Sequence, residues 1–374
     1  MIAHITNQRY LDYDGIKITI GGVQTYITNL IVVLQQLGYE IRIYQAANIA
    51  FRKKLQEHVE VIGVSIKDKN NNSILAKKLT YEVDKNITSP NDIIIYGSDF
   101  YIFKSKHNVR TIGIQHGIFW DIPHSRMSNL SFLIRYIGKA ISAWTVAERV
   151  SIPDLTVCVD NNFINWYRAI TPYRKANLQF LPNFTEIPQK IDKPSIENGI
   201  KVIFARRLQS FRGTKLLASA MERILKEYDN GLLTIAGDGP DESFLKEKFS
   251  ENSRVTFTTY KSEDSLKIHM KHHIAIIPTV GSEGTSLSLL EAMAARCAVI
   301  CTNVGGMTNI ILNKYNGIMI SPDENDLYQA LKTYIDDIAL ISKTSLNAQE
   351  TVESSFSLAT WMQSWKETIL KITV

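Results

Sequence analysis

The sequence predicts an α/β protein made of two domains, each built on a parallel sheet. Short β-rich apolar runs alternate with helical patterns along the whole chain, which is typical of parallel strands joined by crossover helices. The chain is 374 residues long, more than one hydrophobic core usually holds. We therefore expect two separate cores, each with its own sheet.

The first half contains six strand-like runs and one clear helix. In the helix, Gln24–Leu37, apolar residues stand three or four positions apart and share one face, and Gly38 follows its end. The strand-like runs are Ile2–Ile5, Glu40–Tyr44, His58–Val64, Asp92–Tyr96, Thr111–Gln115 and Leu155–Val159. We assign residues 1–185 to the N-terminal domain.

The second half repeats this alternation after a linker. The segment Glu186–Gly199 carries two prolines and mixed charge without periodicity, as linkers do. The strand-like runs that follow are Lys201–Ala205, Leu232–Ala236, Arg254–Thr258, Ile274–Pro278, Ala298–Thr302 and Gly317–Ile320. Residues 186–355 are therefore expected to form the C-terminal domain.

The last segment, 356–374, predicts a helix that docks on another part of the chain. Within Phe356–Ile372, the side chains of Trp361, Trp365 and Ile369 recur every four residues and share one helical face. Leaving two tryptophans exposed on one face would be unfavourable. We therefore expect this face to be buried.

The composition favours a water-soluble globular protein. Apolar residues make up 45% of the chain and charged residues 21%, and no apolar run approaches the roughly 18 residues of a membrane span. The N-terminus lacks the basic-then-apolar pattern of a signal peptide. The three cysteines, Cys158, Cys297 and Cys301, are too few and odd in number for a disulfide framework. These features predict a cytoplasmic protein.

The positive charge lies in the first half of the chain. Residues 1–189 hold 21 Lys and Arg against 15 Asp and Glu, an excess that favours either an anionic partner, such as a membrane surface, or simple solvation. Leu130–Val150 mixes aromatic and basic residues, which fits an interfacial helix, although core packing with solvated charges is the preferred interpretation. The basic residues are too scattered to predict nucleic-acid binding.

The strongest motif is EGTSLSLLEAMAAR, from Glu283 to Arg296. A predicted strand leads into a loop of small residues, and a helix begins near Thr285. Backbone N–H groups at such a helix start favour a phosphate. Glu283 and Glu291 stand in an otherwise apolar stretch, where each carboxylate needs a partner, and sugar hydroxyls are suitable ones. The alternative makes Glu283 a helix cap and Glu291 a member of a salt bridge.

This motif resembles the signature of glycosyltransferase family 4, in which two glutamates with seven residues between them precede "AMA". Six further motifs resemble that family in the expected order along the chain. They are GGVQTY at Gly21–Tyr26, LPNFTE at Leu181–Glu186, FARRLQSFRG at Phe204–Gly213, GDGP at Gly237–Pro240, NVGGM at Asn303–Met307 and NKYNGIMI at Asn313–Ile320. The resemblance implies a GT-B fold, with two Rossmann-like domains facing a central cleft and a C-terminal helix that returns to the N-terminal domain.

The resemblance also implies a donor site. It assigns Arg207 and Arg212 to the donor diphosphate, Glu283 to the transferred sugar and Glu291 to the ribose hydroxyls. The family usually has lysine at the position of Arg212. Arginine keeps the positive charge but replaces the compact ammonium with a planar guanidinium group. Tyr260 matches a contact to the base, although Thr259 stands where glycine is usual. The other implied donor-binding residues are Gly21, Gly22, Gly237, Gly284, Thr285, Ser286 and Leu287.

A histidine completes the catalytic set that the resemblance implies. His116, in the QHG that ends a predicted strand, stands where the family often has a histidine contacting the donor sugar, so we expect it to act with Glu283, Arg207 and Arg212. The alternative is a histidine bonded to nearby backbone. For His124, a structural role is the preferred interpretation. Gly21 and Gly22 could equally form a tight turn before the helix.

Three more polar groups allow functional interpretations. His269 and His273 share a helix face with a metal-like spacing, and His272 lies between them; a solvated polar helix is the preferred interpretation. Asp12 and Asp14 could bind acceptor hydroxyls or lie on an ordinary surface turn. No aspartate pair has an obvious metal-binding spacing.

The implied reaction is a sugar transfer with retention of anomeric configuration. A nucleotide-diphosphate-sugar is the donor, and a hydroxyl of a glycan or lipid-linked acceptor receives the sugar, as in bacterial surface polysaccharide assembly. The leaving diphosphate takes the acceptor proton, so neither a carboxylate nucleophile nor a metal or other cofactor is expected. Three alternatives are an NAD-dependent oxidoreductase, a nucleotide-sugar epimerase or hydrolase, and a non-catalytic binding protein. The oxidoreductase is disfavoured because the third glycine of the G-x-G-x-x-G motif is missing. Cytoplasmic location, with peripheral contact at the inner face of the membrane, would suit this role.

Overall fold

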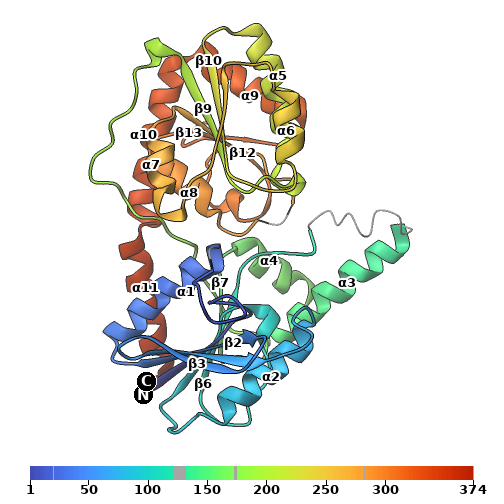
Figure 1. Ribbon diagram of the computed structural model, residues 1–374, viewed down its shortest axis with the longest axis vertical. Coiled ribbons are helices and arrows are strands. Elements are labelled where there is room, and N and C mark those ends of the chain that lie inside the picture. The colour runs from blue at the N-terminus through green and yellow to red at the C-terminus, as the bar shows by residue number, and fades with distance from the viewer. Residues whose placement is uncertain (20, 122–131, 172–174, 282, 374) are drawn as a thin grey trace. The chain divides into compact units, whose positions relative to one another are not determined.

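A computed structural model describes residues 1–19, 21–121, 132–171, 175–281 and 283–373. The chain divides into two compact units (Figure 1), which differ from the expected domains by a few residues at each boundary and by the segment Gly117–Ser128. Unit 1 comprises Met1–His116, Asn129–Pro182 and Trp361–Val374, and unit 2 comprises Gly117–Ser128 and Asn183–Thr360. The domain boundaries expected from the sequence lie after residues 185 and 355. In the structure, the chain passes from unit 1 to unit 2 after Pro182 and returns to unit 1 after Thr360.

Unit 1 is built on an eight-stranded sheet with the order β3-β4-β2-β1-β5-β6-β7-β8. All neighbouring strands are parallel except the edge pair β3 and β4. The strands are β1 (Ile2–Thr6), β2 (Glu40–Ala47), β3 (Phe51–Gln56), β4 (Val59–Ser65), β5 (Ile93–Tyr96), β6 (Arg110–Gln115), β7 (Leu155–Cys158) and β8 (Leu178–Phe180). The six predicted strands are confirmed, and β3 and β8 are the two that the sequence analysis missed.

Five helices accompany this sheet: α1 (Gly22–Gln36), α2 (Asn72–Asp84), α3 (Phe132–Arg149), α4 (Asn161–Ile170) and the C-terminal α11 (Leu358–Thr373). The helices α1 and α2 cover opposite faces, because β1-α1-β2 and β4-α2-β5 cross the sheet in opposite directions and such crossovers are right-handed. The predicted helix Gln24–Leu37 is confirmed as α1, and its apolar face is buried.

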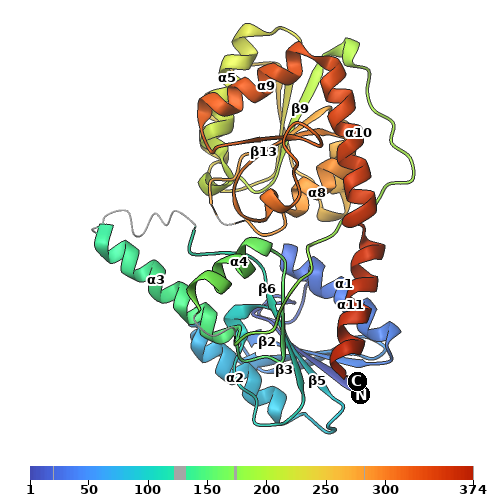
Figure 2. The same cartoon turned by 180° about the vertical axis from the view of Figure 1, so that it is seen from behind.

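The return of the C-terminal helix to unit 1 is confirmed. In α11, Trp361, Trp365 and Ile369 are all buried, and the Trp365 Nε1–H donates a hydrogen bond of 3.0 Å to the Tyr26 hydroxyl of α1. Both indole rings meet the Tyr26 ring edge to face, at centroid distances of 5.0 and 6.2 Å. Figures 1 and 2 show α11 running beside α1.

Unit 2 has a six-stranded, wholly parallel sheet with the order β11-β10-β9-β12-β13-β14. All six predicted strands are confirmed as β9 (Ile200–Ala205), β10 (Gly231–Ala236), β11 (Val255–Thr258), β12 (Ile274–Ile277), β13 (Ala298–Thr302) and β14 (Ile318–Ile320). The helices are α5 (Thr214–Glu227), α6 (Glu242–Lys248), α7 (Ser265–Met270), α8 (Leu287–Ala294), α9 (Glu324–Asp336) and α10 (Ile338–Ser355).

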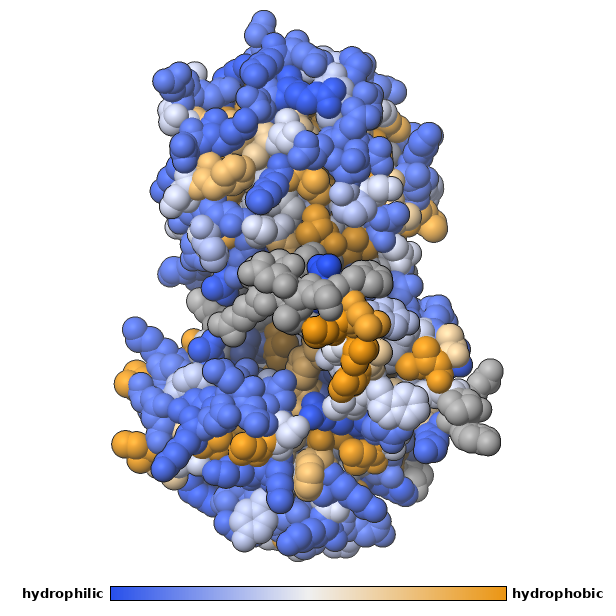
Figure 3. All heavy atoms as spheres, turned by 90° about the vertical axis from the view of Figure 1, so that its right-hand side faces the viewer, coloured by the Kyte–Doolittle hydropathy of each residue, from blue (hydrophilic) through white to orange (hydrophobic). Residues whose placement is uncertain are grey.

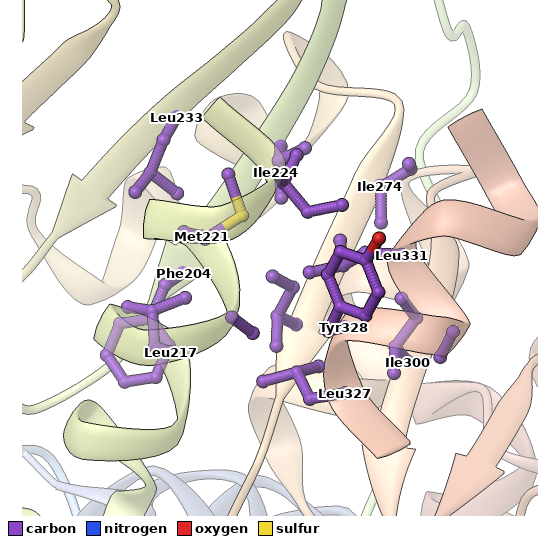
Figure 4. Close-up of a cluster of buried hydrophobic side chains, with 14 of the residues drawn as sticks. Phe204, Leu217, Met221, Ile224, Leu233, Ile274, Ile300, Leu327, Tyr328 and Leu331 are labelled. Carbon is purple, nitrogen blue, oxygen red and sulfur yellow. The ribbon is translucent and has the colours of Figure 1, made fainter. Parts of the chain in front are cut away.

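Helices pack on both faces of the second sheet and form two apolar layers. In one layer, Met221 of α5 and Leu331 of α9 lie over Phe204 and Ile300 of the strands (Figure 4). In the other, residues of α8 and α10 cover the opposite sides of the same strands. The fold class predicted from the alternation of elements is confirmed in both units.

The linker expected at Glu186–Gly199 contains only a short 3-10 turn, Ile196–Asn198. Its Lys193 ammonium donates hydrogen bonds to the carbonyl oxygens of His269 and His272, at 3.3 and 2.5 Å. The linker is therefore fastened to the end of α7 rather than free along its whole length.

The solvated interpretation of the three histidines is wrong. His269, His272 and His273 are all buried, and their rings bond to the carbonyl oxygens of Ser265, Ile268 and Pro194, respectively. Burial lowers the pKa of His269 and of His272 to about 4, so these rings are neutral at neutral pH. Within the described residues, no three His, Cys, Asp or Glu side chains gather as a metal site would require.

The expectation that Leu130–Val150 packs in the core is also wrong for most of the helix it forms. Large apolar side chains of α3 are exposed along its first three turns. Within the parts of the chain that the structure describes, no helix is long and apolar enough to span a bilayer. All three cysteines are buried and free, as predicted.

The burial of Trp365 makes unit 1 dependent on the last helix. Trp365→Ala should lower the free energy of unfolding of unit 1 by about 3–5 kcal/mol, because it opens a cavity and removes the partner of the Tyr26 hydroxyl. Leu370→Ala, at a half-exposed position of the same helix, should stay within about 1 kcal/mol of wild type. Urea titration followed by tryptophan fluorescence measures this, since Trp144, Trp166 and Trp361 remain in unit 1 as reporters. Equal stability of the two variants would contradict the assignment.

Candidate functional site

The residues of the strongest motif lie at the carboxyl edge of the sheet of unit 2. The strands β9 and β12 are hydrogen-bonded neighbours, and the chain crosses outward in opposite directions from them, to β10 and to β13. This point, where the strand order reverses, is where open parallel sheets bind ligands. Arg206 follows β9 directly, and Glu283 lies in the connection from β12 to α8.

A buried carboxylate clamped by two arginines forms the centre of the site. The Glu283 carboxylate accepts hydrogen bonds from Arg206 at 2.8 Å, from Arg212, and from the Thr279 hydroxyl at 3.0 Å. Arg206 also donates to the Thr279 hydroxyl, at 2.6 Å. The exposed fraction of the side chain is 10% for Glu283 and 7% for Arg206, but 26% for Arg212. Arg212 is thus the member of the clamp that solvent or a ligand reaches most easily.

The clamp keeps Glu283 ionised. Burial by itself would raise the pKa of this carboxyl, but the guanidinium groups of Arg206 and Arg212 outweigh it and hold the pKa below its usual value. Two cations and one carboxylate leave a net charge of about +1. The centre of the site is therefore positive and suits an anionic ligand.

Tightly packed glycines fix the loop that carries Glu283. The amide of Gly306 donates to the Glu283 carbonyl oxygen at 3.0 Å, and a Cβ on Gly305 or Gly306 would collide with the backbone of Glu283 or Gly284. The NVGGM motif is explained by this contact. Gly237 has a φ of +140° and lies so close to the Arg206 carbonyl oxygen that no Cβ fits.

The start of α8 brings together the remaining residues of the signature. Gly284, Thr285 and Ser286 precede Leu287, the first residue of the helix, and Thr285 and Ser286 are buried. The Asn183 side chain donates to the Thr285 carbonyl oxygen at 2.6 Å, which ties the LPNFTE motif to this loop. The start of a helix, beside a positive cluster, is a favourable place for phosphate oxygens.

The second glutamate of the signature lies in a different environment. Glu291 is in α8, and its carboxyl accepts a hydrogen bond of 2.6 Å from the Ser265 hydroxyl. Among the ion pairs of the described residues none includes Glu291, which disfavours its interpretation as a salt-bridge member. Burial raises its pKa to about 7. Tyr260 lies near enough for the Glu291 charge to help raise the tyrosine pKa to about 12, after the larger effect of burial.

The arginine that the sequence analysis missed is Arg206. The resemblance pointed to Arg207, whose side chain is exposed, whereas the buried Arg206 reaches Glu283. The position of Arg206 at the end of an apolar strand was a usable signal, because a buried cation requires an anionic partner. A contact between Arg207 and the donor diphosphate remains a prediction.

The predicted residues of unit 1 are placed as follows. His116 follows β6, and its Nε2 lies 2.9 Å from the Gly97 carbonyl oxygen, so Nε2 carries the proton of that hydrogen bond. Burial lowers the pKa of His116 to about 4, so the ring is neutral. The backbone bond proposed as the alternative is thus present, and a catalytic role stays a prediction. Gly21 and Gly22 stand at the start of α1.

The acidic residues before this glycine pair stabilise a surface loop. The Asp12 carboxylate accepts hydrogen bonds from the amides of Ile16 and Lys17, and Asp14 accepts one from the Asn48 side chain. Both contacts agree with the surface-turn interpretation. His124 lies outside the described residues.

Comparisons with known proteins find a family match in the part of the chain that carries the clamp. Residues 199–337, which include the clamp, match the family described as "Glycosyl transferases group 1". The chain is 30% identical over 173 residues to an uncharacterized glycosyltransferase, MJ1607, of Methanocaldococcus jannaschii, and the match covers 45% of this chain and 43% of that relative.

Two solved structures are similar over nearly the whole chain. Sucrose-phosphate synthase from Thermosynechococcus elongatus has a TM-score of 0.78 at 15% identity, covering 99% of this chain and 98% of that one. Anabaena Alr3699/HepE in complex with UDP has a TM-score of 0.71 at 15% identity, covering 99% and 100%. At these identities the similarity establishes the fold, which is GT-B.

The raised pKa of Glu291 makes a prediction for stability. The folded state keeps this proton up to about pH 7, whereas the unfolded chain releases it near its ordinary pKa of 4.5. Stability from Glu291 is therefore full below about pH 4.5 and is lost as pH rises to 7, on the order of 3 kcal/mol. Glu291→Gln, which carries no charge, should become more stable than wild type by that amount at high pH.

Urea titrations from acidic to mildly alkaline pH, followed by far-ultraviolet circular dichroism, measure the difference. The exposed Glu251 of the same unit supplies the control, Glu251→Gln, which should run parallel to wild type. A constant difference between Glu291→Gln and wild type across this range would show that folding does not raise the pKa of this carboxyl.

Proposed function

We propose that the chain transfers a sugar from a nucleotide-diphosphate-sugar to a hydroxyl of a glycan or lipid-linked acceptor. The match of residues 199–337 to the group 1 glycosyltransferases and the GT-B fold support this proposal. The transfer retains the anomeric configuration and is of the hexosyltransferase type. The observation that carries this proposal is the Glu283 carboxylate held between Arg206 and Arg212 at the start of α8.

The positive charge of the clamp acts on the leaving group. As the bond between the sugar and the diphosphate stretches, negative charge grows on the phosphate oxygens. Arg212, the more exposed arginine of the clamp, and the neighbouring exposed Arg207 bind those oxygens together with the amides that start α8. Groups already in place need no reorganisation during the reaction, which makes this stabilisation effective.

The two glutamates divide the donor between them. Glu283 accepts hydrogen bonds from hydroxyls of the transferred sugar, because its charge is fixed and its remaining lone pairs can serve as acceptors. Glu291 accepts from the ribose hydroxyls, and Tyr260, which lies near it, contacts the base. The complex of UDP with the structurally similar Anabaena protein supports a nucleoside diphosphate as the ligand of this fold.

Proton transfer needs no further side chain in this proposal. The departing diphosphate oxygen lies on the face that the acceptor hydroxyl attacks, and it takes the hydroxyl proton. His116 contributes a neutral imidazole, which suits a hydrogen bond to a sugar hydroxyl better than a charge would. We assign the acceptor to surface polysaccharide assembly, on the family resemblance alone, at the inner face of a cell membrane.

Binding of a nucleoside diphosphate tests the proposal. In a calorimetric titration with the best ligand from a panel of UDP, GDP, ADP and CMP, Arg212→Ala should weaken affinity about 10- to 100-fold, the value of a hydrogen bond to a charged group. Arg207→Ala should weaken it similarly. Lys226→Ala, an exposed cation at the far end of α5, should bind like wild type. If both arginine variants also bind like wild type, the donor site is elsewhere.

A further inference from the structure

The helix α3 exposes a continuous apolar stripe. The exposed fractions of Leu133, Ile134, Ile137, Ile141 and Trp144 are 64, 52, 48, 62 and 55%, respectively. At about 100° per residue these positions fall within a sector of about 100° on the helix. Figure 3, which views the molecule from the side on which α3 lies, shows apolar side chains gathered on this part of the surface.

Although the stripe is exposed, α3 is not detached from unit 1. Near its C-terminal end, Val146 and Ala147 are buried, and so is Val150, the first residue after the helix. Arg149 donates hydrogen bonds to the Phe100 carbonyl oxygen at 3.4 Å and to the Ser73 hydroxyl at 3.0 Å. The apolar stripe thus belongs to a helix that unit 1 holds firmly at one end.

The charges beside the stripe are positive. Residues 132–147 contain two cations, Arg135 and Lys139, and no acid, and both cations are exposed. On the helix they lie about 100° or more from the edges of the stripe. The nearest acid of the same helix is Glu148, at its C-terminal end. An apolar stripe with aromatic residues and a cationic polar side is the pattern of a helix that lies in a membrane surface.

The neighbouring surface continues this character. The 3-10 turn Asp99–Tyr101 packs against α3, and the chain after it exposes Phe103, Lys104 and Lys106. On the adjoining helix α2, Glu82 pairs with Lys85, and Asp84 accepts hydrogen bonds from two neutral donors, the Ser105 hydroxyl and the Lys106 backbone amide. The four cations Arg135, Lys139, Lys104 and Lys106 outnumber the acids Asp84 and Glu148, so the surface is apolar with a net positive charge.

We propose that α3 docks unit 1 on an anionic lipid bilayer. The stripe from Leu133 to Trp144 enters the boundary between headgroups and acyl chains, and Arg135 and Lys139 bind lipid phosphates. A second copy packed on the stripe would leave Arg135 and Lys139 in solvent on the other side of the helix, whereas a helix sunk among lipid headgroups brings phosphates to its polar side as well. The proposal specifies the surface of the membrane contact and does not depend on the sugar transfer.

Flotation of the full chain with lipid vesicles, without any donor, tests this. Vesicles of phosphatidylcholine with about 30% phosphatidylglycerol should bind the protein at least about 10-fold better than phosphatidylcholine alone, and added salt should weaken binding. Ile137→Glu/Ile141→Glu and, separately, Arg135→Glu/Lys139→Glu should each lower binding about 10-fold or more. These positions are exposed, so the variants should keep the circular dichroism of wild type.

Matched controls use apolar residues exposed elsewhere. Ile49→Glu/Ile338→Glu makes the same change at two exposed positions outside α3 and should bind like wild type. On binding, the fluorescence emission of Trp144 should shift to shorter wavelength. In Trp144→Phe, the contribution of this residue to the shift of the whole protein should be absent.

Three results would overturn the proposal. They are equal binding to both kinds of vesicle, equal binding by the α3 and control variants, and a dimer in solution that Ile137→Glu/Ile141→Glu dissociates. If a double variant misfolds, two measurements on the wild-type protein still test the proposal. They are the salt dependence of vesicle binding and the fluorescence shift of Trp144. Because no donor is present, failure here is distinct from failure of nucleotide binding.

Discussion

The buried carboxylate of Glu283 is the constraint on which the site of unit 2 depends. A carboxylate that is 10% exposed is unfavourable unless cations and hydrogen bonds compensate it. Arg206, Arg212 and Thr279 supply that compensation, and they come from the ends of two adjacent strands and from the turn before α5. The clamp therefore joins two separate connections of the sheet, β9 to α5 and β12 to α8, at the point where its strand order reverses. A positive site and a fixed carboxylate follow from the same contacts.

Close backbone packing around this loop accounts for several glycines of the motifs of unit 2. Gly305 and Gly306 admit the backbone of Glu283 and Gly284, and Gly237 admits that of Arg206. Gly213, with a φ of +85°, lies against the Pro278 carbonyl oxygen in the same way. Glycines from motifs that are far apart in the sequence thus serve one purpose. They let backbone segments approach each other closely around the clamp.

Most of the fold could be predicted from the sequence, because the buried strands are apolar runs. The edge strand β3 reads FRKKLQ and exposes alternate side chains, so it lacks that signal. Periodicity identified the α11 tryptophans, but it could not distinguish the exposed stripe of α3 from a buried one. Of the site, the glutamates and Arg212 were predicted. Arg206 was missed, because motif resemblance aligns positions and does not say which of two adjacent arginines points inward.

In the proposed reaction, Glu283 acts on the sugar and not on the nucleotide. The most direct measurement compares Glu283→Gln with wild type for two quantities, the rate of transfer from the preferred donor and the affinity for the corresponding nucleoside diphosphate. Glutamine keeps the shape and removes the charge that the two arginines hold. Loss of this group should slow transfer about 10²- to 10³-fold while affinity changes less than about 3-fold. Parallel losses of both would place Glu283 at the nucleotide, and unchanged transfer would contradict the central claim.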